Sequence, residues 1–204
     1  MKIICVGRNY VEHIQELQNE VPTEPVIFMK AQTALLRTDY PLYYPKFTKD
    51  LHYEGELVIK ICGNGKKIQE EFAHKYYSEL SIGFDFTARD LQNQLKSKGL
   101  PWELAKSFDG AAAVGKFFPK EELLDSENNY TFTINKNDEL VQLGNTSLML
   151  FSIDKIISFV SQYFTLQKGD LIFTGTPAGV GSVKIGDVLT GYFKEQLVVK
   201  TVVK

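Results

Sequence analysis

The sequence predicts an α+β fold in which strands predominate, and three observations support this. Strand-type segments outnumber helix-type segments, the two types do not alternate as they would around a parallel sheet, and the 204 residues contain no repeat or low-complexity tract. A chain of this length suffices for one substantial core and is short for two. We therefore expect a single domain over residues 1–204.

The first fifty residues predict two short strands and one helix. The apolar residues 3–6 form a strand candidate, and residues 26–29 form a second. Between them, Asn9 and Glu12 have the spacing of a capping box, with Asn9 as the N-cap of a short helix that runs to about Gln18.

The middle of the chain predicts a strand, a hairpin turn and a second strand that leads into a helix. Residues 52–61 form one strand, and the Gly-Asn-Gly at 63–65 is a strong hairpin signal. Residues 81–86 are an apolar strand candidate. The capping-box pattern at 87–90 then opens a helix that ends at Gly99.

The last third of the chain is mainly β-type. Residues 130–134 alternate between apolar and polar side chains, whereas residues 153–163 have helical periodicity. Residues 171–174, 188–193 and 197–203 form three further strand candidates, separated by glycine-rich turns.

Composition and charge exclude several classes of function. The chain has 44% hydrophobic and 24% charged residues, and a formal net charge of −2 provides no long-range attraction to nucleic acid or anionic lipid. No apolar run approaches the roughly 20 residues that cross a bilayer, so we expect neither nucleic acid nor a membrane as a partner. Arg8 interrupts the apolar start too early for a secretory leader. Cys5 and Cys62 are isolated, which indicates a reducing compartment, and we place the protein in the cytoplasm.

The strongest chemical signal is a group of acidic residues around the predicted strand 52–61. Side chains alternate along a strand, so His52, Glu54 and Glu56 are expected on one face. Two bare carboxylates about 5–7 Å apart raise each other's pKa unless a cation neutralises them. Asp85, at the end of the apolar strand, would add a third oxygen ligand. This set suits Mg²⁺ or Mn²⁺, or Ca²⁺ if the cage is looser, and suits zinc less well.

Two of these residues have alternative interpretations. Asp85 lies just before a helix start, where it could instead fix the turn. His52 need not bind metal, and we favour a hydrogen bond from its imidazole to a ligand carboxylate.

Three further residues offer catalytic groups, each with a structural alternative. His13 and Glu16 are three apart on the first predicted helix, so they form either a solvated surface pair or a dyad in which the glutamate orients the imidazole. Lys106 either extends its ammonium group to solvent or places a cation where negative charge develops. The glycine-rich loop 174–181 lacks a P-loop ending, but its N–H groups could bind a carboxylate.

Eight short segments span nearly the whole chain and form a specific ordered set. They are 7–10 (GRNY) with His13 and Glu16, 28–30 (FMK), 52–57 (HYEGEL), 83–92 (GFDFTARDLQ), 99–102 (GLPW), 105–110 (AKSFDG), 142–147 (QLGNTS) and 169–181. Together they resemble the fumarylacetoacetate hydrolase family, and within it the short single-domain members related to acylpyruvases.

The resemblance implies a fold and a set of roles. The implied fold is a mixed β-sandwich roll with a few short flanking helices, in which residues 1–20 supply a strand plus a lid helix and residues 50–204 supply the metal-binding β core. Homodimers are common in the family, so one is expected here. The implied metal ligands are Glu54, Glu56 and Asp85, the catalytic residues are His13, Glu16 and Lys106, and the residues lining the substrate pocket are Arg89, Gln92 and Thr176.

Our hypothesis is therefore the metal-dependent cleavage of a carbon–carbon bond in a small 2-oxo acid of the acylpyruvate type. The metal would chelate the carboxylate and 2-oxo oxygens, the pair of Glu16 and His13 would deprotonate a water that attacks the acyl carbonyl, and Lys106 would stabilise the oxyanion. Pyruvate would leave as its metal-bound enolate.

Four other functions are considered. The same site would serve an oxaloacetate decarboxylase or a keto-enol or dienoate isomerase, because both pass through a related enolate. A metal-dependent nuclease is disfavoured by the net charge and by the absence of a basic stripe. A non-catalytic metal-binding remnant is disfavoured by the presence of His13, Glu16 and Lys106 together.

Overall fold

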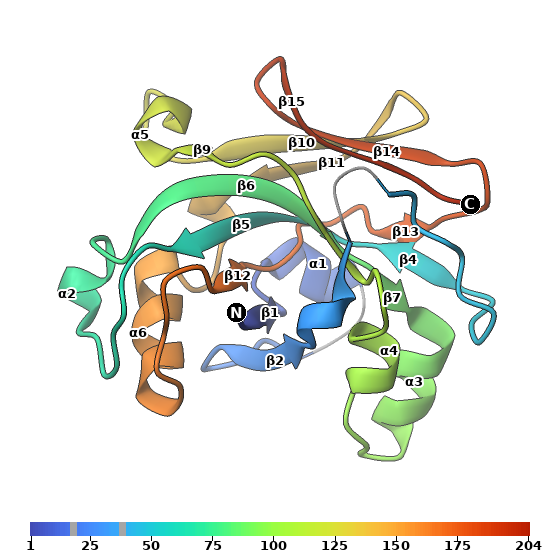
Figure 1. The fold of residues 1–204 in the computed structure, drawn as a ribbon, viewed down its shortest axis with the longest axis horizontal. Helices are drawn as coiled ribbons and strands as arrows, with labels where there is room; N and C mark the ends of the chain where they lie inside the picture. The colour runs from blue at the N-terminus through green and yellow to red at the C-terminus, as the bar shows by residue number, and fades with distance from the viewer. Residues whose placement is uncertain (17–19, 37–39) are drawn as a thin grey trace.

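A curled sheet runs through the centre of the molecule and pairs the first strand of the chain with a strand of its last fifth (Figure 1). The strand order is β2-β1-β12-β5-β6-β8-β3, and β9 also pairs with β6. The first strand, β1 (Ile3–Gly7), runs parallel to β12 (Leu171–Phe173), and both consist of almost entirely apolar, buried residues. Such continuous apolar runs are typical of strands covered on both faces. The predicted α+β class with a dominant β component is confirmed.

The computed structural model describes residues 1–16, 20–36 and 40–204. The remaining strands are β2 (Val26–Lys30), β3 (Leu35–Leu36), β4 (Leu51–Tyr53), β5 (Gly55–Ile61), β6 (Tyr77–Asp85), β7 (Thr87–Ala88), β8 (Ala112–Val114), β9 (Phe118–Pro119), β10 (Thr131–Lys136), β11 (Glu139–Asn145), β13 (Gly181–Ser182), β14 (Val188–Phe193) and β15 (Gln196–Val202). The α-helices are α1 (Val11–Glu16), α2 (Glu70–Ala73), α3 (Arg89–Ser97), α4 (Glu103–Lys106), α5 (Lys120–Leu123) and α6 (Ile153–Tyr163), and 3₁₀ turns cover Gln32–Ala34 and Thr146–Leu148.

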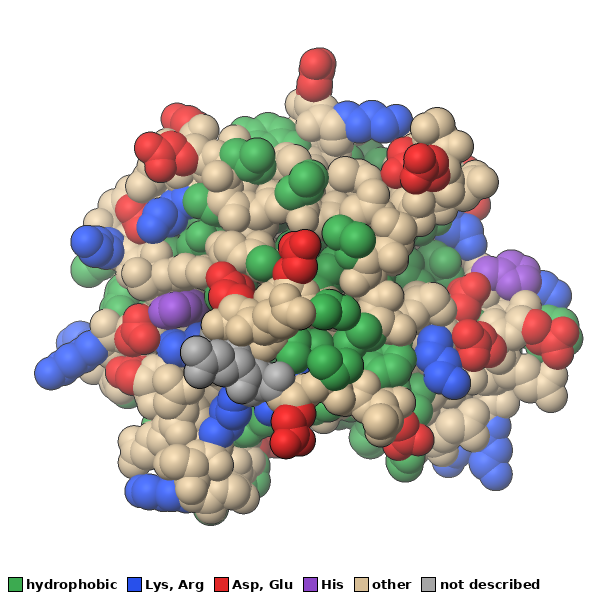
Figure 2. All heavy atoms as spheres, turned by 180° about the vertical axis from the view of Figure 1, so that it is seen from behind, with side chains coloured by type: hydrophobic (Ala, Val, Ile, Leu, Met, Phe, Trp, Pro, Cys, Tyr) green, Lys and Arg blue, Asp and Glu red, His purple; other side chains and the backbone are tan. Residues whose placement is uncertain are grey.

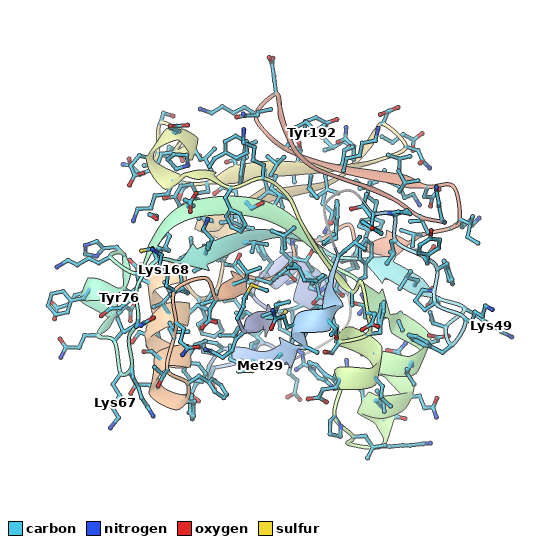
Figure 3. All side chains as sticks on the ribbon, in the orientation of Figure 1. Met29, Lys49, Lys67, Tyr76, Lys168 and Tyr192 are labelled. Carbon is cyan, nitrogen blue, oxygen red and sulfur yellow. The ribbon has the colours of Figure 1, made fainter. Side chains whose placement is uncertain are left out.

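A second, antiparallel sheet lies over β5 and β6, with the order β11-β10-β14-β15 (Figure 1). Side chains fill the space between these layers, and the labelled Tyr192 and Met29 mark opposite sides of the molecule (Figure 3). The layers meet closely at Gly55, where a Cβ atom would lie 2.4 Å from Ile134 Cγ1. Glycine at this position therefore lets the outer sheet pack directly against the strand that carries Glu56.

The helices flank the sheets at two ends. Helix α6 lies beside α2 at one end, and α3 and α4 lie together at the other (Figure 1). The bounds of α6 match the predicted periodicity, and its Ser152 hydroxyl accepts a hydrogen bond from the Lys155 N–H at 3.1 Å as an N-cap. Among the described residues, no helix has the length and apolar character needed to span a bilayer.

The predicted single strand over 52–61 is wrong, because the chain breaks at Glu54. Strand β4 pairs with β7 and β13 in a small three-stranded sheet, whereas β5 pairs with β6 and β12 in the central sheet. The period-2 pattern continues through the break, so the sequence alone does not reveal that the chain changes sheets there.

The hairpin predicted at residues 63–65 is also wrong. Strands β5 and β6 do pair antiparallel, but residues 62–76 connect them and contain α2. Gly65 instead pairs with Leu166 through backbone hydrogen bonds of 3.0 and 2.8 Å. A long-range partner thus uses the backbone groups that would have closed a tight turn.

Neither predicted capping box forms, because distant partners use the side chains. The amide of Asn9 donates to the carbonyls of Phe151 and Thr174 at 3.1 and 2.7 Å, and α1 begins after Tyr10. The Thr87 hydroxyl donates to the Asp85 carbonyl at 3.2 Å and does not cap α3. The predicted end of the first helix near residue 18 lies outside the described residues.

Candidate active site

Three buried carboxylates meet where the central sheet changes direction. Glu54 lies at the break between β4 and β5, Glu56 lies on β5, and Asp85 ends β6. Antiparallel pairing of β5 with β6 brings them together, and the Asp85 N–H donates to the Glu54 carbonyl at 2.8 Å. Each side chain offers an oxygen within 4.8 Å of the others, and the three residues are at most 5% exposed. The residues that sequence analysis predicted as metal ligands therefore form one cluster.

Two lysines and an arginine contact two of these acids. The Lys106 ammonium lies 2.6 Å from Glu54 Oε2 and 2.9 Å from Asp85 Oδ2. Lys30, on β2, lies 2.6 Å from Asp85 Oδ1 and also donates to the Lys106 carbonyl. Arg89, on α3, lies 2.5 Å from Glu54 Oε1. All three cations are themselves buried, so these pairs are shielded from solvent.

The cations determine which acids carry charge. Burial alone would raise the pKa of Glu54, but Lys106 and Arg89 outweigh burial and hold that pKa well below its usual range. Burial would likewise lower the pKa of Lys106, yet Asp85 and Glu54 raise it overall. At neutral pH, Glu54 is therefore an anion and Lys106 a cation.

Of the three acids, Glu56 has the fewest neighbouring groups that offset its negative charge. Burial, followed by repulsion from Asp85 and Glu54, raises the pKa of Glu56 well above its ordinary value. Within the described residues, its one hydrogen-bond partner is the Gly175 N–H at 2.7 Å. A divalent cation between the three carboxylates would remove this repulsion, and an all-oxygen donor set suits Mg²⁺, Mn²⁺ or Ca²⁺. The residues present therefore fit the metal that sequence analysis predicted.

The predicted catalytic pair lies at the edge of the same pocket. His13 lines the pocket with the three acids and is 5% exposed, so it is not part of a solvated surface pair. Its Nδ1 lies 3.1 Å from Glu16 Oε2, and the Gly179 N–H donates to Glu16 Oε1 at 3.2 Å. Both carboxylate oxygens of Glu16 are thus engaged in holding the imidazole and the glycine-rich loop.

The three residues predicted to contact substrate also line this pocket, but most of their polar groups bind protein. The Arg89 guanidinium donates to Gln92 Oε1 at 2.7 Å as well as to Glu54. The Thr176 hydroxyl donates to the Gly55 carbonyl at 2.9 Å and accepts from Gln142 Nε2 at 2.8 Å. These contacts support the strand that bears the glutamates.

The prediction for His52 is wrong. Its Nε2 lies 3.0 Å from Asp50 Oδ1 and does not contact a carboxylate of the cluster. The chain turns at Glu54 between two sheets, so His52 and Glu54 do not share the single strand that would have placed them side by side. The glycine-rich loop does bind carboxylates, as its N–H groups allow, but they are the protein's own Glu16 and Glu56.

The sequence pattern assigns no role to Lys30 or to four residues of the pocket wall. Lys30 belongs to one of the segments that resemble the family, and a lysine that ends a buried strand indicates an ionic partner. Phe28 and Trp102 form an apolar wall, with their rings packed edge-to-face at 5.9 Å between centroids. Arg8 and Lys96 add two more positive charges to the pocket.

Comparison with known proteins gives consistent matches over almost the whole chain. A model of the fumarylacetoacetate hydrolase C-terminal region matches residues 2–203. The mitochondrial oxaloacetate tautomerase FAHD1 of Bos taurus is 45% identical over 185 residues, which are 91% of this chain and 83% of that protein. The oxaloacetate tautomerase YcgM of Escherichia coli (strain K12) is 39% identical over 192 residues, which are 94% of this chain and 88% of that protein.

A solved structure also matches closely. The fumarylpyruvate hydrolase of Pseudomonas aeruginosa, determined in complex with Mn²⁺ and pyruvate, superposes with a TM-score of 0.92 at 32% identity. The match covers 100% of this chain and 89% of that one.

One expectation is overturned by these matches. The cytoplasmic location is wrong as an inference from the cysteines, because the Bos taurus relative is named as a mitochondrial protein. Two thiols without a disulfide indicate reducing surroundings, and that property does not distinguish one reducing compartment from another.

Proposed function

Because the chain belongs to the fumarylacetoacetate hydrolase family, we propose that it is a divalent-metal-dependent enzyme that interconverts the keto and enol forms of oxaloacetate. One observation carries the proposal: a buried imidazole, held at Nδ1 by Glu16, lines the same pocket as the three carboxylates. Enolisation needs a proton acceptor beside an electrophilic site, and this pocket provides the residues for both.

Glu54, Glu56 and Asp85 would hold the metal. When bound there, a divalent cation supplies Lewis acidity toward the 2-oxo group of the substrate. The carboxylates need a fixed arrangement for this role. Lys106 bridges Glu54 and Asp85, and the Gly175 N–H holds Glu56.

His13 is the residue suited to move the proton. Its Nδ1 faces Glu16, which leaves Nε2 to take a proton from C3 of the substrate. The C3–H electron pair then forms the C2–C3 double bond, the carbonyl π pair moves onto the 2-oxo oxygen, and that oxygen gains a proton from solvent to give the enol. The Glu16 carboxylate accepts a hydrogen bond from the Nδ1–H group of His13. It therefore favours the tautomer and orientation in which Nε2 is unprotonated and can accept a proton. Reversal of these steps returns the proton to C3 and gives the keto form.

Lys106 is suited to stabilise negative charge on the substrate oxygen. An ammonium group has three N–H donors, and Glu54 and Asp85 accept two of them. The third donor remains for an oxygen that becomes anionic. The charged state of Lys106 is secured because its two acidic partners raise its pKa.

The experiment measures the decay of the oxaloacetate enol by ultraviolet absorption, with Mg²⁺ or Mn²⁺ present. We expect rapid conversion by the wild-type protein, a loss of at least 100-fold in kcat for His13→Asn, and a smaller loss for Glu16→Gln. His74→Asn is the matched control, since His74 is exposed and distant from the pocket wall. Unchanged enol decay in His13→Asn would contradict the proposal.

Hydrolysis of an acylpyruvate is the second candidate, supported by the likeness to fumarylpyruvate hydrolase. It requires a water beside His13 in addition to the groups already described. Acetylpyruvate supplied under the same conditions separates the two reactions. A kcat/KM for acetylpyruvate cleavage above that for oxaloacetate would favour the hydrolase, and release of pyruvate from oxaloacetate would favour the decarboxylase.

The homodimer implied by the family resemblance stays a prediction. Val11, Leu143 and Leu148 are exposed apolar residues around one shallow hollow beside α1. Figure 2 shows that hydrophobic side chains gather near the middle of the face opposite to that of Figure 1. Such patches are compatible with a partner surface.

A further inference from the structure

Four lysine and arginine residues line the pocket: Arg8, Arg89, Lys96 and Lys106. Arg89 and Lys106 contact the buried acids Glu54 and Asp85, and Lys30, which is not among the lining residues, contacts Asp85 as well. Arg8 contacts neither acid. Its charge therefore remains for another anion, and the pocket that it lines is where the substrate of the proposed function would bind.

Arg8 is the pocket arginine that is available to a ligand. It is half-buried, and within the described part of the chain its guanidinium forms no hydrogen bond or ion pair. Arg89, by contrast, already donates to Glu54 and Gln92. A guanidinium group carries five N–H donors in a planar fork that matches the two oxygens of a carboxylate.

The backbone holds Arg8 in an unusual conformation. Its φ of +59° lies in the left-handed region, which residues with a side chain rarely adopt. The neighbouring Asn9 fixes this turn through side-chain hydrogen bonds to Phe151 and Thr174 of 3.1 and 2.7 Å. A position of this kind, over-determined by its neighbours and lining a pocket, is typical of a ligand-binding residue.

Lys96 approaches the same region from α3. Arg89, Gln92 and Lys96 are spaced three and four residues apart, so they lie along one face of that helix, and all three line the pocket. Partial burial lowers the pKa of Lys96, and the nearby positive charge of Arg8 lowers it further. Two cations that repel each other in this way create a local preference for an anion.

We propose that Arg8, assisted by Lys96 at the rim, binds the second carboxylate of a dicarboxylic 2-oxo acid. This assignment rests on the proposed function, because it places the first carboxylate and the 2-oxo group near Glu54, Glu56 and Asp85. It makes Arg8 the residue that distinguishes a dicarboxylate such as oxaloacetate from a monocarboxylate. Lys96, which is exposed, contributes less than Arg8 because solvent screens its charge.

Malate and lactate provide a matched pair of probes that are not turned over by enolisation. Both carry a 2-hydroxy carboxylate, and they differ in the second carboxylate of malate. Isothermal titration calorimetry of the Mn²⁺-loaded protein measures both dissociation constants. For the wild-type protein we expect malate to bind at least tenfold more tightly than lactate.

Arg8→Gln is expected to remove most of this preference while changing the lactate dissociation constant less than threefold. Arg8→Gly provides a second variant, because glycine adopts a positive φ without strain and removes the same charge. Lys96→Gln should lower the preference by about threefold. Lys98→Gln, on an exposed residue that does not line the pocket, is the control and should leave it unchanged.

Retention of the malate preference in both Arg8 variants would overturn the assignment, as would a wild-type protein that does not distinguish the two probes. These results are separable from a failure of the proposed function. A protein that prefers malate through Arg8 but leaves the oxaloacetate enol unchanged would contradict the tautomerase activity and leave the carboxylate site standing.

Discussion

Glu56, one of the three proposed metal ligands, is expected to destabilise the metal-free protein. It is 2% exposed, two other carboxylates lie within 4.8 Å, and a single backbone N–H offsets the repulsion. Glu54 and Asp85 have buried cations as direct partners, whereas Glu56 has none among the described residues. The pKa of Glu56 is raised for this reason.

The raised pKa predicts a pH-dependent cost to the metal-free protein. In the unfolded chain Glu56 ionises near the ordinary glutamate value, whereas in the folded chain it stays protonated to higher pH. Between these values the folded state binds more protons, so its stability falls as the pH rises. Glu56→Gln removes the ionisable carboxyl group and with it this loss of stability at higher pH. In the presence of a chelator we expect the variant to be more stable than wild type at pH 8 by about 1 kcal/mol, or roughly 2–4 °C in Tm, and to lose that advantage at pH 5.

Thermal unfolding at the two pH values measures this effect. Glu70→Gln serves as the control, because Glu70 is half-exposed and its pair with Lys155 is long, at 3.7 Å. An advantage of Glu56→Gln that is equal at pH 5 and pH 8 would argue against a raised pKa at this position.

The three acids that cluster in the structure were predicted from the sequence, but partly for a wrong reason. Alternation along one strand placed Glu54 and Glu56 side by side, and they are side by side, although Glu54 lies at a break between two sheets. The same argument failed for His52, which lies beyond that break. The alternation rule holds only while the chain stays in one sheet, and nothing local signals the change.

The turn between β1 and α1 connects the central sheet to the helix that carries His13. Asn9 is fully buried there, and its side chain makes three hydrogen bonds of 2.7 to 3.1 Å to Phe151 and Thr174. These bonds join the start of α1 to segments more than 140 residues away. The turn thereby positions Arg8 and His13 relative to the central sheet.

Asn9→Ala is therefore expected to lower the free energy of unfolding by about 2–4 kcal/mol, because it leaves buried backbone groups without partners. Urea unfolding measures the change. Asn93→Ala on the exposed face of α3 should stay within about 0.5 kcal/mol of wild type. Equal unfolding midpoints for Asn9→Ala and wild type would show that the turn does not depend on these bonds.

The existence of the longer helices could be predicted from the sequence more reliably than the residues that cap them. The sequence indicated α3 and α6 correctly, because their apolar spacing reflects burial. It misassigned Asn9 and Asp90 as local caps. Asp90 accepts hydrogen bonds from Thr48 and the Lys49 N–H at 2.5 and 2.9 Å, and so ties α3 to the loop before β4. A capping pattern does not reveal a competing partner that is distant along the chain.

Most strands of the molecule could be predicted from the sequence, but which strands pair with one another in the sheets could not. Most apolar runs became strands near their predicted bounds, yet the pairing of β1 with β12 joins residues almost 170 positions apart. That pairing brings the glycine-rich loop to the carboxylates, where Gly175 and Gly179 hold Glu56 and Glu16. The overall arrangement came from the family resemblance and not from periodicity.

We expect Glu54, Glu56 and Asp85 together to bind one divalent cation. This is measured by titration of the purified protein with Mn²⁺, followed by electron paramagnetic resonance of the free ion. The wild-type chain should bind one ion tightly, and Asp85→Asn, which removes one of the three charged ligands, should weaken the affinity at least 100-fold. A wild-type chain that binds no Mn²⁺, or an Asp85→Asn variant that binds it as tightly as wild type, would show that these three carboxylates do not form the metal site.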